Sequence, residues 1–260
     1  MSQIYELFRD ALRAETPVAL ATVIEGPGLG SKLLLRSGAE SVGSLGNEGL
    51  DRVVERDAMA ELDAGTSGVR HYGPNGEARQ TEVSVFIETH AARHQLVIFG
   101  AVDFTRALAA QGKLLGYRVT VCDAREVFAT KRRFPMADEV VVDWPNRLLD
   151  RIGDSLGPRD AVCVLTHDNK FDVPAITSAL KTRVGYIGAM GSRRTTDTRN
   201  ERLREVGVTD AEIERIMAPI GLDIGARSPE ETAVSIVAEI IASRTGRTAP
   251  NLRDRDGSIH

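Results

Sequence analysis

The stretch Val184-Gly185-Tyr186-Ile187-Gly188-Ala189-Met190-Gly191-Ser192-Arg193-Arg194-Thr195 joins an apolar run to a glycine-containing turn and then to a helix-like segment. Glycines let the backbone come close to a bound group, and a helix N-terminus presents unpaired N–H groups with a partial positive charge. Ser192 adds a hydroxyl, and Arg193 and Arg194 add full charges. The stretch therefore predicts a strand, a turn and a helix that bind a phosphate-bearing ligand. The alternative is a tight turn whose arginines are merely solvated.

The same alternation of apolar runs and helical stripes extends back from this stretch to the segment His90-Ala91-Ala92-Arg93-His94. Such alternation predicts an α/β fold with a Rossmann-like, mostly parallel sheet. The expected strands cover residues 96–99, 119–122, 140–142, 161–165 and 184–187.

Helices are expected between and after these strands, over residues 104–115 and 147–156. Asp172 is the expected N-cap of a further helix, with Pro174 in its first turn. After Thr195 the chain is expected to be helical to its end. Ser228-Pro229-Glu230-Glu231 has the pattern of a capping box and should open the last helix.

The segment before residue 90 has a different pattern. Apolar residues at helical spacing between Ile4 and Leu12 are followed by Pro17, then by strand-like runs at 18–24, 32–35 and 83–87 and a helical pattern at 51–62. These features predict a smaller α+β module over residues 1–90, a Rossmann-like domain over 95–244 and a loose tail over 245–260.

Composition narrows the class of protein. The 260 residues are 42% apolar, carry a net charge of −4 and show no basic stripe with interleaved aromatics, so nucleic acid is not an expected partner. The apolar runs are too short to span a membrane, and the N-terminus has no secretory leader pattern, so a cytoplasmic protein is expected. Cys122 and Cys163 lie in apolar runs and are expected to be buried thiols rather than metal ligands or a disulfide.

Polar groups and glycines follow the predicted strands, and the carboxyl ends of parallel strands form the usual binding crevice of this fold. We expect the following residues to meet there and to bind a cofactor: Gly100, Asp103, Asp123, Arg125, Thr166, His167, Asp168, Gly188, Met190, Gly191, Ser192, Arg193 and Arg194.

The signal for a nicotinamide dinucleotide is mixed. Asp123 falls about 23 positions after Gly100, near where a Rossmann domain keeps its ribose-binding acid. However, Val102 stands where the second glycine of the fingerprint is needed, which argues against NAD(P). His167 is either a general acid/base or a polar group that satisfies the strand end, and Lys131-Arg132-Arg133 is expected to be a solvated face. No catalytic arrangement emerges, and a binding crevice is the clearer prediction.

Four motifs together resemble the XdhC/CoxI family, the accessory factors of xanthine dehydrogenase and carbon monoxide dehydrogenase. They are Leu165-Thr166-His167-Asp168, the stretch from Tyr186 to Arg194, Ala218-Pro219-Ile220-Gly221-Leu222-Asp223-Ile224-Gly225-Ala226, and the segment from Ser228 to Ile240. The resemblance is specific over residues 95–244 and looser over residues 5–88.

The resemblance implies a small XdhC/CoxI module followed by a Rossmann-like domain. It further implies a chaperone rather than a turnover enzyme, often a homodimer, that binds molybdenum cofactor and delivers it to a molybdenum hydroxylase. Molybdopterin carries a phosphate, which the turn at Ser192-Arg193-Arg194 would hold.

The chain departs from the family pattern at several positions. A family cysteine is missing near Gly46-Asn47-Glu48-Gly49-Leu50-Asp51, and a second is missing near Thr81-Glu82-Val83. Gly28-Leu29-Gly30-Ser31-Lys32 replaces a Gly-Ser-Ser-Pro-Arg motif, and the Rossmann turn reads Gly100-Ala101-Val102-Asp103 instead of Gly-Ala-Gly-His. A thiolate is a natural ligand for molybdenum or carrier of sulfur, so its loss leaves two alternatives open: a non-catalytic interaction module, or an NAD(P)-dependent oxidoreductase.

Overall fold

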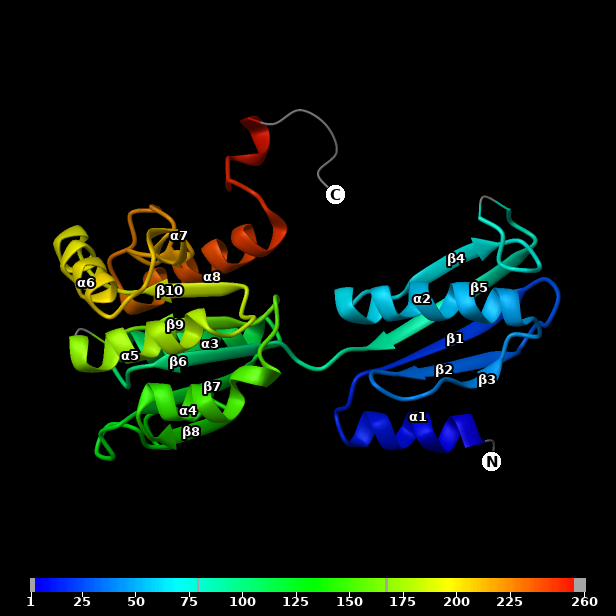
Figure 1. Cartoon of the computed structure of the whole chain (residues 1–260), viewed down its shortest axis with the longest axis horizontal. Coiled ribbons are helices and arrows are strands. Elements are labelled where there is room, and N and C mark those ends of the chain that lie inside the picture. The colour runs from blue at the N-terminus through cyan, green and yellow to red at the C-terminus, as the bar shows by residue number, and fades with distance from the viewer. Residues whose placement is uncertain (1–2, 79, 167, 255–260) are drawn as a thin grey trace. The chain divides into compact units, whose positions relative to one another are not determined.

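The structure, a computed structural model, describes residues 3–78, 80–166 and 168–254. The chain forms two compact units, Met1–Ala92 and Arg93–His260 (Figure 1). Each unit has its own sheet and its own buried core.

The first unit is an antiparallel α+β module. Its five-stranded sheet has the order β3-β2-β1-β5-β4. The elements along the chain are α1 (Gln3–Arg13), β1 (Val18–Glu25), β2 (Lys32–Arg36), β3 (Val42–Ser44), α2 (Glu48–Ala64), β4 (Gly68–Tyr72) and β5 (Val83–His90).

The two helices of the first unit cover opposite faces of its sheet (Figure 1). Successive side chains of a strand point to opposite faces, and β1 shows this clearly. Ala19 and Ala21 pack with Leu50 and Val54 of α2, whereas Val18 packs with Ala11 of α1. The alternating apolar pattern of β1 therefore serves two cores.

The second unit is a doubly wound α/β domain. Its six-stranded sheet has the order β11-β10-β9-β6-β7-β8, and every neighbouring pair is parallel. The strands are β6 (Gln95–Phe99), β7 (Arg118–Asp123), β8 (Glu139–Val142), β9 (Ala161–Val164), β10 (Tyr186–Ala189) and β11 (Ile216–Met217). The helices are α3 (Asp103–Leu114), α4 (Pro145–Ile152), α5 (Asn169–Leu180), α6 (Arg193–Glu205), α7 (Asp210–Ile213) and α8 (Pro229–Thr245), with short 3₁₀ helices η1 (Gly153–Ser155) and η2 (Leu252–Asp254).

Helices cover both faces of the parallel sheet. One core joins α3 and α8 to the sheet through residues such as Leu108 and Ile236. The other joins α4, α5 and α6 through residues such as Leu148, Ile176 and Leu203. Because both faces are covered, β9 is apolar throughout and β6 is apolar after Gln95, as is usual in parallel sheets. The predicted Rossmann-like α/β fold with a smaller α+β module is confirmed.

Several local expectations are wrong. Asp172 does not cap α5: the N-cap is Asp168, whose carboxylate accepts from the N–H of Lys170, and Pro174 lies inside the helix. The chain after Thr195 is not helical throughout, because β11 and the segment at 218–228 separate α7 from α8. The capping box at Ser228 and Glu231 is present, with both of its hydrogen bonds. Strands β3, β4 and β11 were not expected from the sequence; β3 and β11 are very short and β4 is polar.

Candidate functional site

The carboxyl edge of the parallel sheet gathers most of the predicted binding residues. Since β10, β9, β6 and β7 are consecutive and parallel, the turns that follow them lie side by side along one edge. Backbone bonds continue past the strand ends: the N–H groups of Gly100, Leu165 and Met190 donate to carbonyls of the neighbouring strands. The edge is therefore a single continuous surface of turns, where α/β proteins bind ligands.

The turn after β6 is packed tightly against the turn after β9. Gly100 has a φ of +108°, and a Cβ there would lie 2.7 Å from Cγ2 of Thr166 and 3.0 Å from its backbone nitrogen. The hydroxyl of Thr105 in α3 donates to the Gly100 carbonyl. Gly100 is thus required because the two turns pack closely. This packing explains the glycine without a ligand that approaches its backbone.

Asp123, at the end of β7, is fully engaged by its neighbours. Its Oδ2 accepts from the N–H of Ala101 at 2.8 Å, and both its oxygens accept from the Arg125 guanidinium, at 2.9 and 2.7 Å. Burial opposes ionisation, but the hydrogen bonds from Arg125 and Ala101 hold the pKa of Asp123 below its usual value. A carboxylate committed in this way is not free to accept a ribose hydroxyl, so the geometry does not favour NAD(P).

Arg125 belongs to a cluster of cations and aromatic rings that the sequence did not indicate. Its guanidinium lies 4.6 Å from the ring centroid of Phe128 and 5.9 Å from that of Phe171. Trp144, the residue before α4, packs on Phe171 with centroids 4.9 Å apart. Phe171 is buried, whereas Phe128 and Trp144 are exposed to 40% and 39%. Planar faces beside a guanidinium suit the stacking of a planar heterocycle.

The turn after β9 leads into α5. Asp168 is exposed and caps this helix, and its carboxylate also lies 3.3 Å from Nζ of Lys170. The N–H of Lys170 and its ammonium lower the pKa of Asp168. Thr166 is buried and donates from its hydroxyl to Asp172. His167 lies outside the described residues, so its predicted role as an acid/base or ligand stays a prediction.

The turn after β10 leads into α6. Gly188 lies within β10, where a Cβ would lie 2.5 Å from Cδ1 of Ile220, so this glycine serves packing and not the turn itself. Met190 and Gly191 form the turn, and Ser192 is the N-cap of α6, with its Oγ accepting from the N–H of Thr195 at 3.1 Å. The first turn of α6 therefore opens at the carboxyl edge.

Arg193 and Arg194 are both exposed at this helix start. Arg194 lines a small hollow of about 200 Å³ together with Asn169 of α5 and with Thr195 and Thr198 of α6. The hollow joins the starts of two helices, whose partial positive charges add to that of the guanidinium. Hydroxyl, amide and guanidinium donors around a space of this size suit a phosphate group.

Arg199 supports this turn from below. It is 1% exposed, and its Nη2 donates to the Met190 carbonyl at 2.5 Å and lies 3.3 Å from Oδ2 of Asp172. Burial lowers the pKa of Arg199, and Asp172 offsets part of that effect. Its Nε and Nη1 are buried and have no hydrogen-bond partner among the residues that the structure describes. One guanidinium thus ties the turn after β10 to both α5 and α6.

Asp103, at the start of α3, pairs with Arg133 and with none of the other predicted site residues that the structure describes. Its side chain is exposed and lies 3.7 Å from Nη2 of Arg133. Arg133 also donates to the carbonyls of Ala101 and Phe128, and Lys131 donates to that of Ala137. The expectation of a solvated face is confirmed for Lys131 and Arg132, which are exposed, and is wrong for Arg133, which is half-buried against backbone carbonyls.

Both cysteines are buried and free, as expected. Burial raises the pKa of Cys122 to about 12 and raises that of Cys163 as well. Both side chains are 0% exposed, so neither thiol is presented to a ligand at the surface of the carboxyl edge. Among the described residues, no group of three or more His, Cys, Asp and Glu side chains could hold a metal ion. No helix in the same part of the chain is long and apolar enough to cross a membrane.

Two protein-family models match the chain. The XdhC Rossmann domain matches residues 96–240, and the XdhC and CoxI family matches residues 11–73. The motifs of the carboxyl edge all fall within the first match.

Three curated proteins are similar to this chain in sequence. The uncharacterized protein YqeB of Escherichia coli (strain K12) is 28% identical over 249 residues, which are 90% of this chain and 46% of that protein. A probable subunit of xanthine dehydrogenase from Bacillus subtilis (strain 168) is 34% identical, over 62% of this chain and 46% of that protein. The molybdenum cofactor insertion chaperone PaoD of Escherichia coli (strain K12) is 36% identical, over 32% of this chain and 26% of that protein. The chain spans less than half the length of each of these relatives.

A crystal structure described as a xanthine dehydrogenase from Bacillus halodurans has the same fold. The similarity has a TM-score of 0.57 and covers 96% of this chain and 98% of that chain, at 22% sequence identity. At this level of identity the likeness concerns the fold alone.

Proposed function

Because the chain belongs to the XdhC and CoxI family, we propose that it is an accessory protein of molybdenum enzymes. In this proposal it binds molybdenum cofactor at the carboxyl edge of the second unit and delivers it to a hydroxylase of the xanthine or carbon monoxide dehydrogenase type. The names of two relatives support the proposal, since one is a cofactor insertion chaperone and the other a probable subunit of xanthine dehydrogenase. We further propose that the protein acts in the cytoplasm and that it forms a homodimer.

The observation that carries the proposal is the turn after β10. Ser192 opens α6 at the carboxyl edge, and Arg193 and Arg194 are exposed at the same point. Both arginines are therefore available to the phosphate of a pterin cofactor, and the N-terminus of α6 adds its partial charge.

The pterin ring would lie over the cluster of Arg125, Phe128 and Trp144 farther along the edge. These residues offer exposed planar faces beside a cation, while Asp168 offers an acceptor at the start of α5. The cofactor would be held by its phosphate and its ring, since both cysteines of the chain are buried and protonated.

Release is as important as binding for a delivery protein. Contacts through exposed arginines and ring faces are individually modest, and no covalent or thiolate bond to the metal has to break. The absence of the family cysteines from this sequence is therefore consistent with a carrier that binds the phosphate and the ring of the cofactor and not its metal.

The test is the pterin content of protein purified from a host that makes the cofactor. Pterin would be measured by fluorescence after oxidation, and bound molybdenum by elemental analysis. The wild-type chain should carry pterin near one per chain, and the Arg193→Ala, Arg194→Ala double variant should lose most of it. Arg202→Ala, which removes an exposed arginine from the far end of the same helix, is the matched control and should retain the pterin.

The interaction-module alternative predicts a different result. Wild-type protein without pterin, from a host in which a known binder is loaded, would reject the carrier proposal. A client complex that forms equally well without cofactor would then favour the module.

A further inference from the structure

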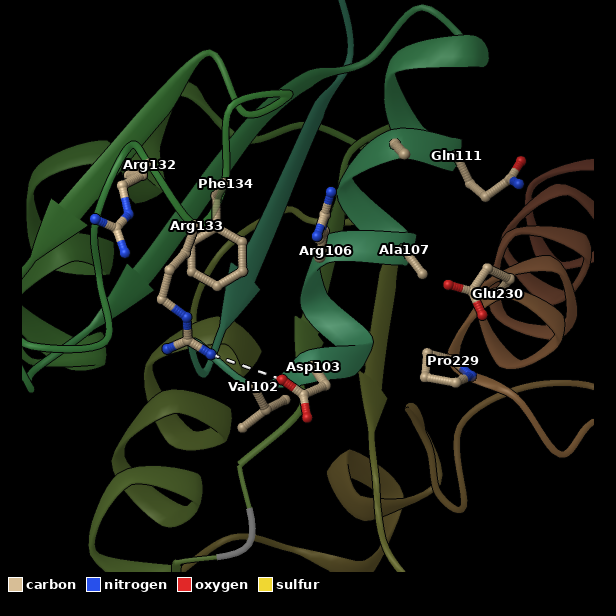
Figure 2. A pocket seen from close by; sticks show the side chains of 11 residues that line it. Val102, Asp103, Arg106, Ala107, Gln111, Arg132, Arg133, Phe134, Pro229 and Glu230 are labelled. Atoms are coloured by element: carbon tan, nitrogen blue, oxygen red, sulfur yellow. Dashed lines mark ion pairs between the residues drawn. The ribbon is translucent and has the colours of Figure 1, made fainter.

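A large groove lies along α3 (Figure 2), and no residue of the turn at Ser192 is among the described residues that line it. It has a volume of about 740 Å³. The floor is one face of α3 between Asp103 and Gln111, one wall is the segment from Arg132 to Phe134, and the other is the start of α8 at Pro229 and Glu230. All of these residues belong to the second unit. We refer to this space as the α3 groove; its volume is typical of small-molecule sites.

Three guanidinium groups from two separate parts of the chain line the α3 groove. Arg106 comes from α3, and Arg132 and Arg133 come from the segment between β7 and β8. Within the described residues, the side chains of Arg106 and Arg132 make no hydrogen bond or ion pair, and both residues are exposed. Two cations without counter-ions are thus available to an incoming anion.

Arg133 is held in place by the protein. Its Nη1 donates to the carbonyls of Ala101 and Phe128 at 3.1 and 3.2 Å, and its Nη2 lies 3.7 Å from Oδ1 of Asp103. A half-buried guanidinium held by two backbone carbonyls is ordered before any ligand arrives. This arrangement reduces the conformational entropy that binding would cost.

The start of α3 adds a further attraction for an anion. Its N-cap is Val102, which has no side chain able to accept from the first N–H groups of the helix. No capping oxygen therefore neutralises this terminus, although the carboxylate of Asp103 in the first turn, which pairs with Arg133, offsets part of its charge. Val102 and Asp103 themselves line the α3 groove.

The other residues that line the α3 groove indicate which further groups a ligand would need. Ala107 and Ala110 form a shallow floor of small side chains, and the ring of Phe134 stands beside them. Glu230 lies across α3 from Arg132 (Figure 2). A ligand that fits would have an anionic end near the arginines, a compact body over the alanines and a hydrogen-bond donor directed to Glu230.

We propose that the α3 groove is a binding site for a nucleotide or a phosphate ester of nucleotide size. The phosphates pair with Arg106 and Arg132 beside the pre-ordered Arg133, the base lies over Ala107 and Ala110, and an amino group of the base donates to Glu230. This site shares no residue with the proposed cofactor turn at Ser192, although Arg133 also contacts Phe128 of the proposed pterin surface, and its test does not require the proposed function to hold.

Isothermal titration of the full-length protein with ADP tests the proposal, with inorganic pyrophosphate as a second probe. ADP should bind at micromolar to millimolar concentration, and pyrophosphate more weakly. The Arg106→Gln, Arg132→Gln variant should weaken ADP binding at least tenfold. Ala110→Leu leaves every charge in place but fills the floor, and it should weaken ADP much more than pyrophosphate.

The matched control is the Arg193→Ala, Arg194→Ala variant, which alters the other anion site and should bind ADP like the wild type. Urea unfolding of each variant would verify that it folds. No heat from the wild type at millimolar ADP would overturn the proposal. So would ADP affinity that survives Arg106→Gln, Arg132→Gln or Ala110→Leu in folded protein, and so would affinity lost in the control.

Discussion

Arg199 and Asp172 form an ion pair in the interior of the second unit, with Nη2 3.3 Å from Oδ2 and each side chain only 1% exposed. Asp172 also accepts the hydroxyl of Thr166, and Arg199 donates to the carbonyl of Met190. The pair therefore joins α5 and α6 to the turns after β9 and β10. It lies directly beneath the surface where we propose that cofactor binds.

Replacing Arg199 should be costly. Arg199→Leu leaves the Asp172 carboxylate buried beside an apolar group, and breaking such a pair from one side costs about 3–5 kcal/mol. The double variant Arg199→Leu, Asp172→Asn removes both charges and should recover a substantial part of that loss. Urea unfolding of the three proteins would measure both effects. Wild-type stability in Arg199→Leu would show that the pair contributes nothing to the fold.

Gly100 should tolerate no side chain, for two separable reasons. Gly100→Ala places a Cβ at a φ of +108° and 2.7 Å from Cγ2 of Thr166. Gly116 is the matched control, because its φ is +82° and no atom lies within 4 Å of the added Cβ. Gly116→Ala should cost about 1–2 kcal/mol from the backbone conformation alone. Gly100→Ala should cost clearly more in the same unfolding assay, and equal losses would contradict the tight packing of the two turns.

Alkaline pH should destabilise the protein through its buried thiols. Burial raises the pKa of Cys122 to about 12, whereas a thiol in the unfolded chain has a pKa of about 8.5. A raised folded-state pKa means that the contribution is fully present below pH 8.5 and is lost as the pH rises toward 12, because unfolding then releases a proton. Between pH 8.5 and 10 this amounts to about 2 kcal/mol for Cys122.

The comparison of wild type with Cys122→Ala isolates this effect. The variant lacks the thiol, so its stability should fall less steeply between pH 8.5 and 10 when urea midpoints are measured. The same burial predicts that native protein reacts with a thiol reagent far more slowly than unfolded protein. Parallel stability curves for the two proteins would exclude Cys122 as a source of the alkaline loss.

Ser192 allows capping and ligand binding to be separated. Aspartate and asparagine cap a helix about as well as serine, so Ser192→Asp and Ser192→Asn should unfold close to the wild type, while Ser192→Ala should lose about 1 kcal/mol. The added charge of Ser192→Asp should repel a phosphate and lower the pterin content, whereas Ser192→Asn should retain it. If the aspartate variant carries as much pterin as the asparagine variant, the phosphate does not lie at this turn.

The strands of the second unit could be predicted because they are buried on both faces. The apolar runs at Leu96–Val97–Ile98–Phe99 and Val119–Val121 indicate buried strands, because segments with apolar residues at helical spacing separate them. The missed strands have no such signal: β4 exposes most of its side chains, and β11 has two residues. These strands form because they pair with strands that are distant in the sequence, and a local pattern of apolar residues does not reveal such pairing.

The residues in the turns of the candidate site could be predicted from the sequence, but the buried residues that support these turns could not. Ser192 was correctly expected at a helix start, because a hydroxyl after a glycine turn is a local signal. Asp172 was misread as a cap since its partner, Arg199, lies 27 positions away. The α3 groove was missed for the same reason, as Arg106, Arg132 and Glu230 come from three separate segments of the chain.

The burial of Arg199 has a consequence for how ionic strength acts on the proposed cofactor site. Arg193 and Arg194 are exposed, so dissolved ions screen their attraction for a phosphate over a Debye length of about 8 Å at 0.15 M. The guanidinium that fixes the Met190 carbonyl is shielded from solvent and is screened much less. A rise in salt would therefore loosen the cargo and leave the shape of the turn unchanged, so that an emptied carrier is ready to load again.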